Sequence, residues 1–300
     1  MTVLDRRSFL TAAATAPLIC NCTTFAADPK RPKLDNELGI TTGSFMRHLS
    51  VERKAGKLQL LDLPKLMRDE LGLRVIDLMT ATLASFEPAY VEDLRNRAEK
   101  ADCLITNLKM NQKGLDMASS DRAVRKRSMD EYKRTIDVAH RLGCRWVRPA
   151  PGRKRPDAKR LTGAYRELID YAAPKSISLL IENNGWMRDD DDAIPSVVRA
   201  VGRGLKVSPD TGNWTDATRY KGLAKAFPVA VTCDFKAYMF GPNGEHPRYD
   251  LKRCFQTGWD AGFRGPWCFE HFNETLAGQL KGFVRLRDML RRWMKEAANE

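Results

Sequence analysis

The residues AHRLGCRWVR, at positions 139–148, contain the pattern that decides the fold. An amphipathic helical stretch runs into Gly143, and a short β-type run follows at 145–148. Gly72 and Gly262 stand at the same point, between a helical stretch and a strand-like run. Glycine is a common residue just past the end of a helix, because it adopts left-handed backbone angles without strain. The chain is therefore built from repeated helix–glycine–strand units.

Eight β-type runs alternate with helical stretches in which apolar residues recur at spacings of three and four. The eight runs are 38–45, 75–79, 104–108, 145–148, 178–181, 205–207, 229–233 and 267–269. Strands that alternate with helices form a parallel sheet, because parallel neighbours need a crossover connection. Eight such units in about 260 residues match the size of a TIM barrel. We predict the α/β class and a single (β/α)8 TIM barrel over 37–300. A doubly wound open sheet is the alternative, but no G-x-G-x-x-G follows the first strand.

The composition is that of a globular protein, with 300 residues, 43% of them hydrophobic and 30% charged. Disordered, collagen-like and low-complexity classes are therefore excluded. No apolar run approaches the roughly 20 residues of a membrane-spanning helix. The 51 Lys and Arg exceed the 38 Asp and Glu, which gives a formal charge of +13. This excess favours anionic partners, and much of it falls in 122–160, where fourteen basic residues accompany four acidic ones.

The first 27 residues have the three parts of a bacterial export signal. Arg6 and Arg7 precede a mildly apolar stretch at 9–19, and small residues follow at Ala26 and Ala27. The paired arginines before Ser8 resemble a twin-arginine signal. We predict a signal peptide over 1–27, a polar linker over 28–36, and a periplasmic or extracellular protein. An amphipathic first helix with two chance arginines is the alternative. The five cysteines after Ala27 show no C-x-x-C pairing, so neither a disulfide scaffold nor a zinc finger is indicated.

Four consecutive strand-like runs are each followed by an acidic residue: Glu182, Asp210, Asp234 and Glu270. In a TIM barrel, functional groups gather at the C-terminal ends of the strands. Four carboxylates that converge there repel one another unless they are protonated or hold a cation. Carboxylate oxygens are hard ligands, so we predict one divalent metal ion, with Mn²⁺ or Mg²⁺ favoured and Zn²⁺ an option. The alternative is that some of these acids cap the helices that follow them.

Four short segments carry a resemblance to a known family: IENN at 181–184, SPDTGNW at 208–214, DFK at 234–236 and WCFE at 267–270. They resemble the xylose isomerase-like TIM barrels, a superfamily of sugar isomerases, epimerases and dehydratases. The resemblance implies one divalent metal bound by Glu, Asp, His and Glu, and Glu182, Asp210 and Glu270 match three of these ligands. Asp234 stands where the family has the histidine. Asn213 stands where the family often has a second histidine that contacts substrate.

The resemblance implies a mechanism of enolisation on a keto sugar. Glu182 and Glu270 would be the catalytic pair that removes and returns a proton beside the carbonyl group. A pair of carboxylates can serve as base and acid when the environment separates their pKa values. We therefore expect a metal-dependent sugar isomerase or epimerase. The alternatives are a dehydratase or lyase of the same superfamily, and a barrel that binds a sugar or a partner without turnover.

Further residues near the expected site are candidates for substrate contact. Lys236 follows Asp234 by two positions and can share its face, although a salt bridge at the rim explains it equally well. Trp186 and Trp214 closely follow two of the acids, and aromatic rings suit sugars. His246 belongs to a long loop after the seventh run, and Asn213 completes the set.

The expected partner is a small-molecule carbohydrate, and a homo-oligomer is compatible with the sequence. A nucleic-acid partner is disfavoured, although endonuclease IV has the fold implied by the resemblance. That enzyme needs several histidines, and this chain has four in all.

Overall fold

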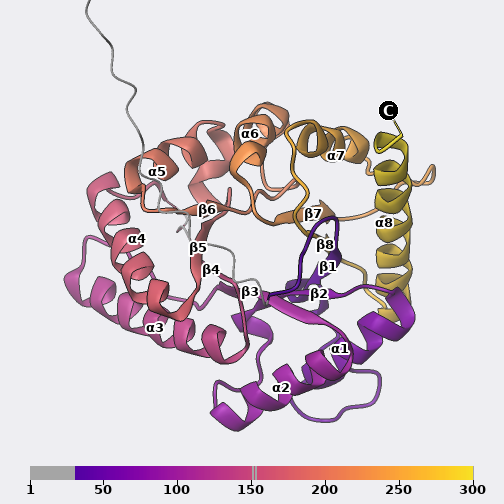
Figure 1. Cartoon of the computed structure of the whole chain (residues 1–300), viewed down its shortest axis with the longest axis horizontal. Helices are drawn as coiled ribbons and strands as arrows, with labels where there is room; N and C mark the ends of the chain where they lie inside the picture. Colours follow the sequence, from indigo (N-terminus) through magenta and orange to yellow (C-terminus); the bar gives the residue numbers. More distant parts are fainter. Residues whose placement is uncertain (1–30, 151, 153, 300) are drawn as a thin grey trace, which may run out of the picture.

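The computed structural model describes residues 31–150, 152 and 154–299. It shows a ring of parallel strands enclosed by helices (Figure 1). The strands are β1 (Leu38–Thr41), β2 (Val75–Met79), β3 (Leu104–Met110), β4 (Trp146–Pro149), β5 (Ser178–Ile181), β6 (Lys206–Val207), β7 (Cys233–Ala237) and β8 (Trp267–His271). Their order is β6-β5-β4-β3-β2-β1-β8-β7. Isolated bridges from Val207 to Ala230 and from Asp210 to Asp234 close the ring between β6 and β7. The predicted TIM barrel is confirmed.

Within the described part of the chain, eight α-helices follow the strands in turn and cover the outside of the barrel (Figure 1). They are α1 (Leu63–Leu66), α2 (Pro88–Lys100), α3 (Arg122–Arg141), α4 (Ala158–Ala172), α5 (Ala193–Val201), α6 (Arg219–Ala226), α7 (Leu251–Asp260) and α8 (Leu276–Ala297). The apolar face predicted for α3 is buried, with Tyr132, Ile136 and Ala139 fully enclosed. Gly143, just after α3, has φ of +79°, as expected of a left-handed helix stop.

The seventh strand lies further along the chain than predicted. The run 229–233 was expected to be the strand, whereas β7 covers Cys233–Ala237. A short 3-10 turn containing Pro228 occupies Phe227–Val229, and Val229 is half exposed. The register with β8 begins only where Cys233 meets Trp267. Asp234 and Lys236 consequently lie inside β7 rather than beyond its end.

The core between β7, β8, α7 and α8 is aromatic. Trp267 contacts Phe227, Phe235, Phe255 and Phe263, with ring centroids 4.8–5.7 Å apart. Burial of each such side chain stabilises the fold by about 1.5–3 kcal/mol, so this cluster anchors the strands that carry Asp234 and Glu270. The five cysteines of the described residues are buried and free, in agreement with the absence of a disulfide pattern.

The predicted export signal lies outside the described residues, except that the linker is described from Arg31 onward. Leu34 is buried, and the amide of Asn36 donates to the carbonyl oxygen of Arg264 just before β8. The end of the predicted linker therefore packs at the N-terminal end of the barrel, opposite the mouth. Among the described residues, no helix combines the length and apolar character that crossing a membrane requires.

Candidate functional site

The four predicted acids all lie at the C-terminal end of the barrel. Glu182 directly follows β5, and Asp210 follows β6 by three residues. Asp234 lies within β7 and Glu270 within β8. Because the eight strands are parallel, all four residues are carried to the same mouth.

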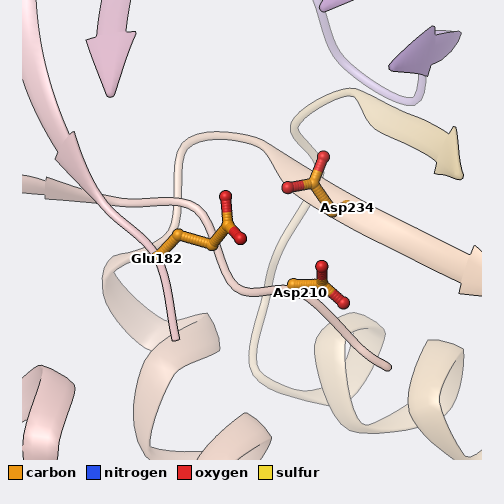
Figure 2. A group of neighbouring side chains, drawn as sticks. All are labelled: Glu182, Asp210 and Asp234. Atoms are coloured by element: carbon orange, nitrogen blue, oxygen red, sulfur yellow. The ribbon is translucent and has the colours of Figure 1, made fainter. Parts of the chain in front are cut away.

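The structure brings three of these acids into one group. Glu182, Asp210 and Asp234 each offer a carboxylate oxygen, and these oxygens all lie within 4.8 Å of one another. Figure 2 shows the three side chains gathered together, with Glu182 and Asp210 on the segments that follow β5 and β6 and Asp234 on β7. All three side chains are buried, with at most 3% of the residue exposed. Glu270 is not a member of this group.

Residues of the segments 181–184 and 208–214 hold Asp210 in place by hydrogen bonds. The side chain of Asn183 accepts from the amide of Asp210 at 2.8 Å and donates to its carbonyl oxygen at 2.9 Å. The amides of Gly212 and Asn213 donate to Asp210 Oδ1 at 2.8 and 3.1 Å. One carboxylate oxygen is therefore held by the backbone, and Oδ2 remains directed into the site.

A buried lysine that the sequence analysis missed contacts Asp234. Lys109 Nζ, from β3, lies 2.5 Å from Asp234 Oδ1 and 3.4 Å from Asp77 Oδ2, from β2. Thr41, at the end of β1, also donates its hydroxyl to Asp234 Oδ1 at 2.9 Å. Lys109 and Asp77 are each no more than 2% exposed. The sequence contains a signal for Lys109 and Asp77, because each is a charged residue in a largely apolar strand. A charged residue in such a strand is a candidate for the interior of the barrel.

Arg148, from β4, is the second cation that the sequence analysis missed. Its Nε lies 2.9 Å from Glu182 Oε2, and its guanidinium donates to Asn111 Oδ1 at 2.8 Å. The residue is 1% exposed. Arg148 therefore pairs electrostatically with Glu182 from the neighbouring strand, without a hydrogen bond between these two atoms.

Lys236 is the third cation, and it connects the fourth acid to the group. Its Nζ lies 2.6 Å from Asp210 Oδ2 and 2.8 Å from Glu270 Oε2. It also donates to Asn213 Oδ1 at 2.9 Å, and Asn213 Nδ2 donates to Glu182 Oε1 at 3.0 Å. A continuous chain of polar contacts thus runs from Glu182 through Asn213 and Lys236 to Glu270. Asn213 and Lys236, which were both predicted to bind substrate, therefore connect Glu182 with Glu270, the two predicted catalytic glutamates.

The pKa values of these groups reflect burial and mutual attraction. Burial raises the pKa of Asp210 to about 7, and Lys236 opposes the rise. Burial likewise raises the pKa of Asp77 to about 7 against the influence of Lys109. Burial also acts to raise the pKa of Asp234, but the contact with Lys109 outweighs it and brings the pKa below its usual range. The pKa values of Lys109 and Lys236 are raised despite burial, because each ammonium lies between carboxylates.

The charge of the cluster suits an additional divalent cation. Asp77, Glu182, Asp210, Asp234 and Glu270 face Lys109, Arg148 and Lys236, which leaves two negative charges when all are ionised. Asp234 Oδ2 is buried and accepts no hydrogen bond from the described residues. Buried charge without compensation is costly, and hard oxygen donors are the ligands that Mg²⁺ and Mn²⁺ prefer. The residues present therefore fit a metal ion held by Glu182, Asp210 and Asp234.

Comparison with known proteins agrees with this fold. The family model for the xylose isomerase-like TIM barrel matches residues 69–295. The chain belongs to this family. L-ribulose-5-phosphate 3-epimerase UlaE from Shigella sonnei is 24% identical over 202 residues, which cover 60% of this chain and 69% of the relative.

Two solved structures show the same fold at low identity. An L-ribulose 3-epimerase has a TM-score of 0.71 at 16% identity, over 87% of this chain and 95% of its own. A xylose isomerase-like TIM barrel protein from Mycobacterium smegmatis, in complex with magnesium, has a TM-score of 0.61 at 18% identity. That match covers 86% of this chain and 97% of the other.

The remaining predicted substrate residues occupy different places in this xylose isomerase-like barrel. Trp186 is half-buried under the guanidinium of Arg155, 4.4 Å from its ring centroid. His246 is buried, with its ring 3.9 Å from that of Tyr249. Trp214 lies in the hydrophobic core against Gly222 of α6. We therefore leave Trp214 out of the proposed substrate contacts.

The structure adds an aromatic pair beside Lys236 that the sequence analysis did not single out. Tyr238 and Phe272 stack with centroids 5.9 Å apart, and Lys236 Nζ lies 5.3 Å from the Tyr238 centroid. Tyr238 is 37% exposed, so part of its side chain is accessible to a ligand. Amphipathic aromatic side chains of this kind suit the faces of sugar rings.

Proposed function

We propose that this protein is a divalent-metal-dependent isomerase or epimerase of keto sugars. The observation that carries the proposal is the group of three buried carboxylates, with Asp234 Oδ2 lacking a hydrogen bond among the described residues. The names of its relatives support the substrate class, since they include L-ribulose-5-phosphate 3-epimerase and L-ribulose 3-epimerase. Magnesium in the related Mycobacterium smegmatis protein supports the choice of a hard divalent ion.

The two glutamates have different surroundings and therefore different roles. Glu182 Oε1 accepts a hydrogen bond from Asn213, Oε2 lies 2.9 Å from Arg148 Nε as an ion pair without a hydrogen bond among the described residues, and the residue is 3% exposed. Glu270 is engaged by Lys236 through Oε2, and its side chain is 13% exposed. Glu270 is thus the base that reaches the carbon beside the substrate carbonyl. Glu182 is the opposed carboxyl group at the other end of the Asn213–Lys236 link. To complete an epimerisation it must enter the step protonated, give that proton to the other face of the carbon and regain one from solvent, while Glu270 releases the proton it took.

Glu182, Asp210 and Asp234 would hold the metal, which as a Lewis acid supplies stabilisation of negative charge on the substrate oxygens. Lys236 orients Glu270 and lies next to Tyr238, whose accessible part receives the sugar ring. Proton removal beside a carbonyl is the common first step of isomerisation, epimerisation and β-elimination. The dehydratase alternative therefore shares this machinery and differs only in the steps after proton removal.

A second function, carbohydrate binding without turnover, is favoured by one specific observation. Each of the four acids already has an internal cation as a neighbour: Arg148 beside Glu182, Lys109 beside Asp234, and Lys236 beside Asp210 and Glu270. A cluster stabilised in this way can hold its shape without catalysing a reaction. The two functions differ in whether the protein exchanges a carbon-bound proton with solvent.

The distinguishing experiment is deuterium exchange in D₂O with Mn²⁺ or Mg²⁺ and unphosphorylated ketopentoses and ketohexoses. The proposal predicts deuterium at the carbon beside the carbonyl by NMR. Loss of the base typically costs about 10²–10⁴-fold in rate, so Glu270→Gln should exchange slowly. The exposed Glu274 provides the matched control Glu274→Gln, which should exchange at the wild-type rate. Ligand-induced stabilisation with no exchange for any sugar would support the binding function instead.

We also propose that the protein is exported across the bacterial inner membrane through its twin-arginine segment. Arg6 and Arg7 support this proposal, and they lie outside the described residues. Export favours unphosphorylated sugars as substrates, because phosphorylated sugars belong mostly to the cytoplasm. Replacement of both arginines by lysine should retain the protein in the cytoplasmic fraction, whereas unchanged periplasmic recovery would contradict export.

A further inference from the structure

We infer that the metal shell of this barrel contains three protein carboxylates, and that Lys236 keeps Glu270 out of it. The inference rests on the proposed function, since it concerns the same metal. It assigns Lys236 as a positioning residue that reserves Glu270 for proton transfer. Glu182, Asp210 and Asp234 are then the protein ligands.

The position of Glu270 is the first support. The three other acids have oxygens within 4.8 Å of one another, and Glu270 falls outside this group. Its Oε2 is instead 2.8 Å from Lys236 Nζ. For Glu270 to join the metal, it would have to give up its contact with an almost entirely buried ammonium, which would then keep only one of its two carboxylate neighbours, Asp210.

The confinement of Lys236 is the second support. Its ammonium contacts Asp210, Glu270 and Asn213 together. Its aliphatic stem passes over Gly212 so closely that a Cβ there would lie 2.6 Å from Lys236 Cδ. The Tyr249 hydroxyl donates to the Lys236 carbonyl oxygen at 2.5 Å and so holds the backbone. Lys236 therefore has little freedom to withdraw when a metal enters.

The charge balance is the third support. When all are ionised, the five acids and three cations of the cluster leave two negative charges, which a divalent ion would neutralise while Lys236 keeps its proton. The charge balance alone therefore does not require Lys236 to leave when a metal binds. The metal and Lys236 then act side by side, the metal on the triad and the ammonium on Asp210 and Glu270.

The test is a double-mutant cycle on Mn²⁺ affinity, measured by titration calorimetry on the metal-free protein without substrate. The four proteins are the wild type, Glu270→Gln, Lys236→Met and the double variant. In the wild-type background Glu270→Gln should weaken Mn²⁺ binding by no more than the roughly 10–100-fold typical of residues outside the ligand shell, because Glu270 is not a ligand. Lys236→Met should strengthen binding by about tenfold or more, since it removes a like charge and releases Glu270 to the metal. That gain should vanish in the double variant.

Two controls and one reference complete the design. Asp234→Asn, which removes a ligand, should weaken binding by more than about a hundredfold. Glu274→Gln and Lys281→Met carry the same substitutions at exposed positions near the mouth and on α8, and they should leave affinity unchanged. Circular dichroism checks that each variant is folded, and the Glu270→Gln comparison stands even if Lys236→Met fails to fold.

Each contrary outcome has a distinct meaning. If Glu270→Gln weakens binding as much as Asp234→Asn does, Glu270 is a ligand; the inference is then overturned while the proposed function stands. If Lys236→Met binds Mn²⁺ no more tightly than the wild type, Lys236 does not hold Glu270 away, and the inference is overturned as well. If the wild type binds no Mn²⁺ at all, the proposed metal-dependent function fails and the inference fails with it.

Discussion

The two halves of the barrel contribute opposite charges to the site. The half formed by β5 to β8 supplies Glu182, Asp210, Asp234 and Glu270. The half formed by β1 to β4 supplies the buried cations Lys109 and Arg148, with Asp77 beside Lys109. The acidic half also supplies a cation of its own to the cluster, Lys236 on β7. The comparison teaches that the buried acids of one half are balanced by cations that reach them across the barrel from the other half.

The largest effect is expected from removing a cation of the first half. Lys109→Met leaves Asp234 and Asp77 buried without their ammonium, and loss of one partner of a buried pair costs about 3–5 kcal/mol. The free energy of unfolding of the metal-free protein, measured in urea, should fall by this amount. Lys113→Met, at an exposed position four residues later, is the control and should change stability little. An unchanged free energy of unfolding in Lys109→Met would contradict this view of the two halves, because the buried acids would then be stable without a neighbouring cation.

A smaller effect is expected from crowding Lys236 in the acidic half. Gly212→Ala places a Cβ 2.6 Å from Lys236 Cδ and 2.9 Å from the Tyr249 hydroxyl. Overpacking of this kind costs about 1–3 kcal/mol and should displace Lys236 from Asp210 and Glu270. Gly163→Ala, in α4 with open space around it, is the matched control and should be neutral or slightly stabilising. Equal melting temperatures for the two variants would show that Lys236 is not confined.

The smallest effect concerns the pH dependence of the loop over the acidic half. Burial, and the nearby Arg219 and Arg248, lower the pKa of His246 to about 4 from an ordinary value of 6.5. The folded state therefore takes up this proton less readily than the unfolded state, and stability falls as the pH drops from about 6.5 toward 4.

His246→Gln should abolish this contribution, which amounts to about 1 kcal/mol at pH 5 after allowance for solvent screening. Urea unfolding at pH 7 and pH 5 measures it, with the exposed His140→Gln as control. The same pH dependence in His246→Gln and the wild type would show that His246 keeps an ordinary pKa in the folded protein.

Much of the fold and the acidic half were accessible from the sequence. The helix–glycine–strand units predicted the barrel, and Val75–Met79 and Ser178–Ile181 agree with the predicted strands residue for residue. The acids were visible because they follow apolar runs. His271, the residue after Glu270, packs near Phe283 of α8, with its Nδ1 2.7 Å from the carbonyl oxygen of Ala237.

The cationic half was harder to predict, because its residues lie inside strands rather than after them. Lys109 and Arg148 each stand near the end of an apolar run. A charged residue at such a position is also compatible with a sheet edge or an irregular strand. Their partners are more than thirty residues away, Asp234 for Lys109 and Glu182 for Arg148, so only the closed barrel brings them together. The displaced seventh strand has a similar origin: the register with β8, rather than the local apolar run, decides where pairing begins.

The central claim is that the three acids hold a metal ion, and metal content tests it most directly. Purified protein, dialysed against Mn²⁺ and then against metal-free buffer, is compared by elemental analysis with Asp234→Asn and with the exposed control Glu274→Gln. The account predicts about one equivalent of Mn²⁺ per chain in the wild type and the control, and almost none in Asp234→Asn. Wild-type protein without bound metal, or Asp234→Asn with a full equivalent, would contradict the claim.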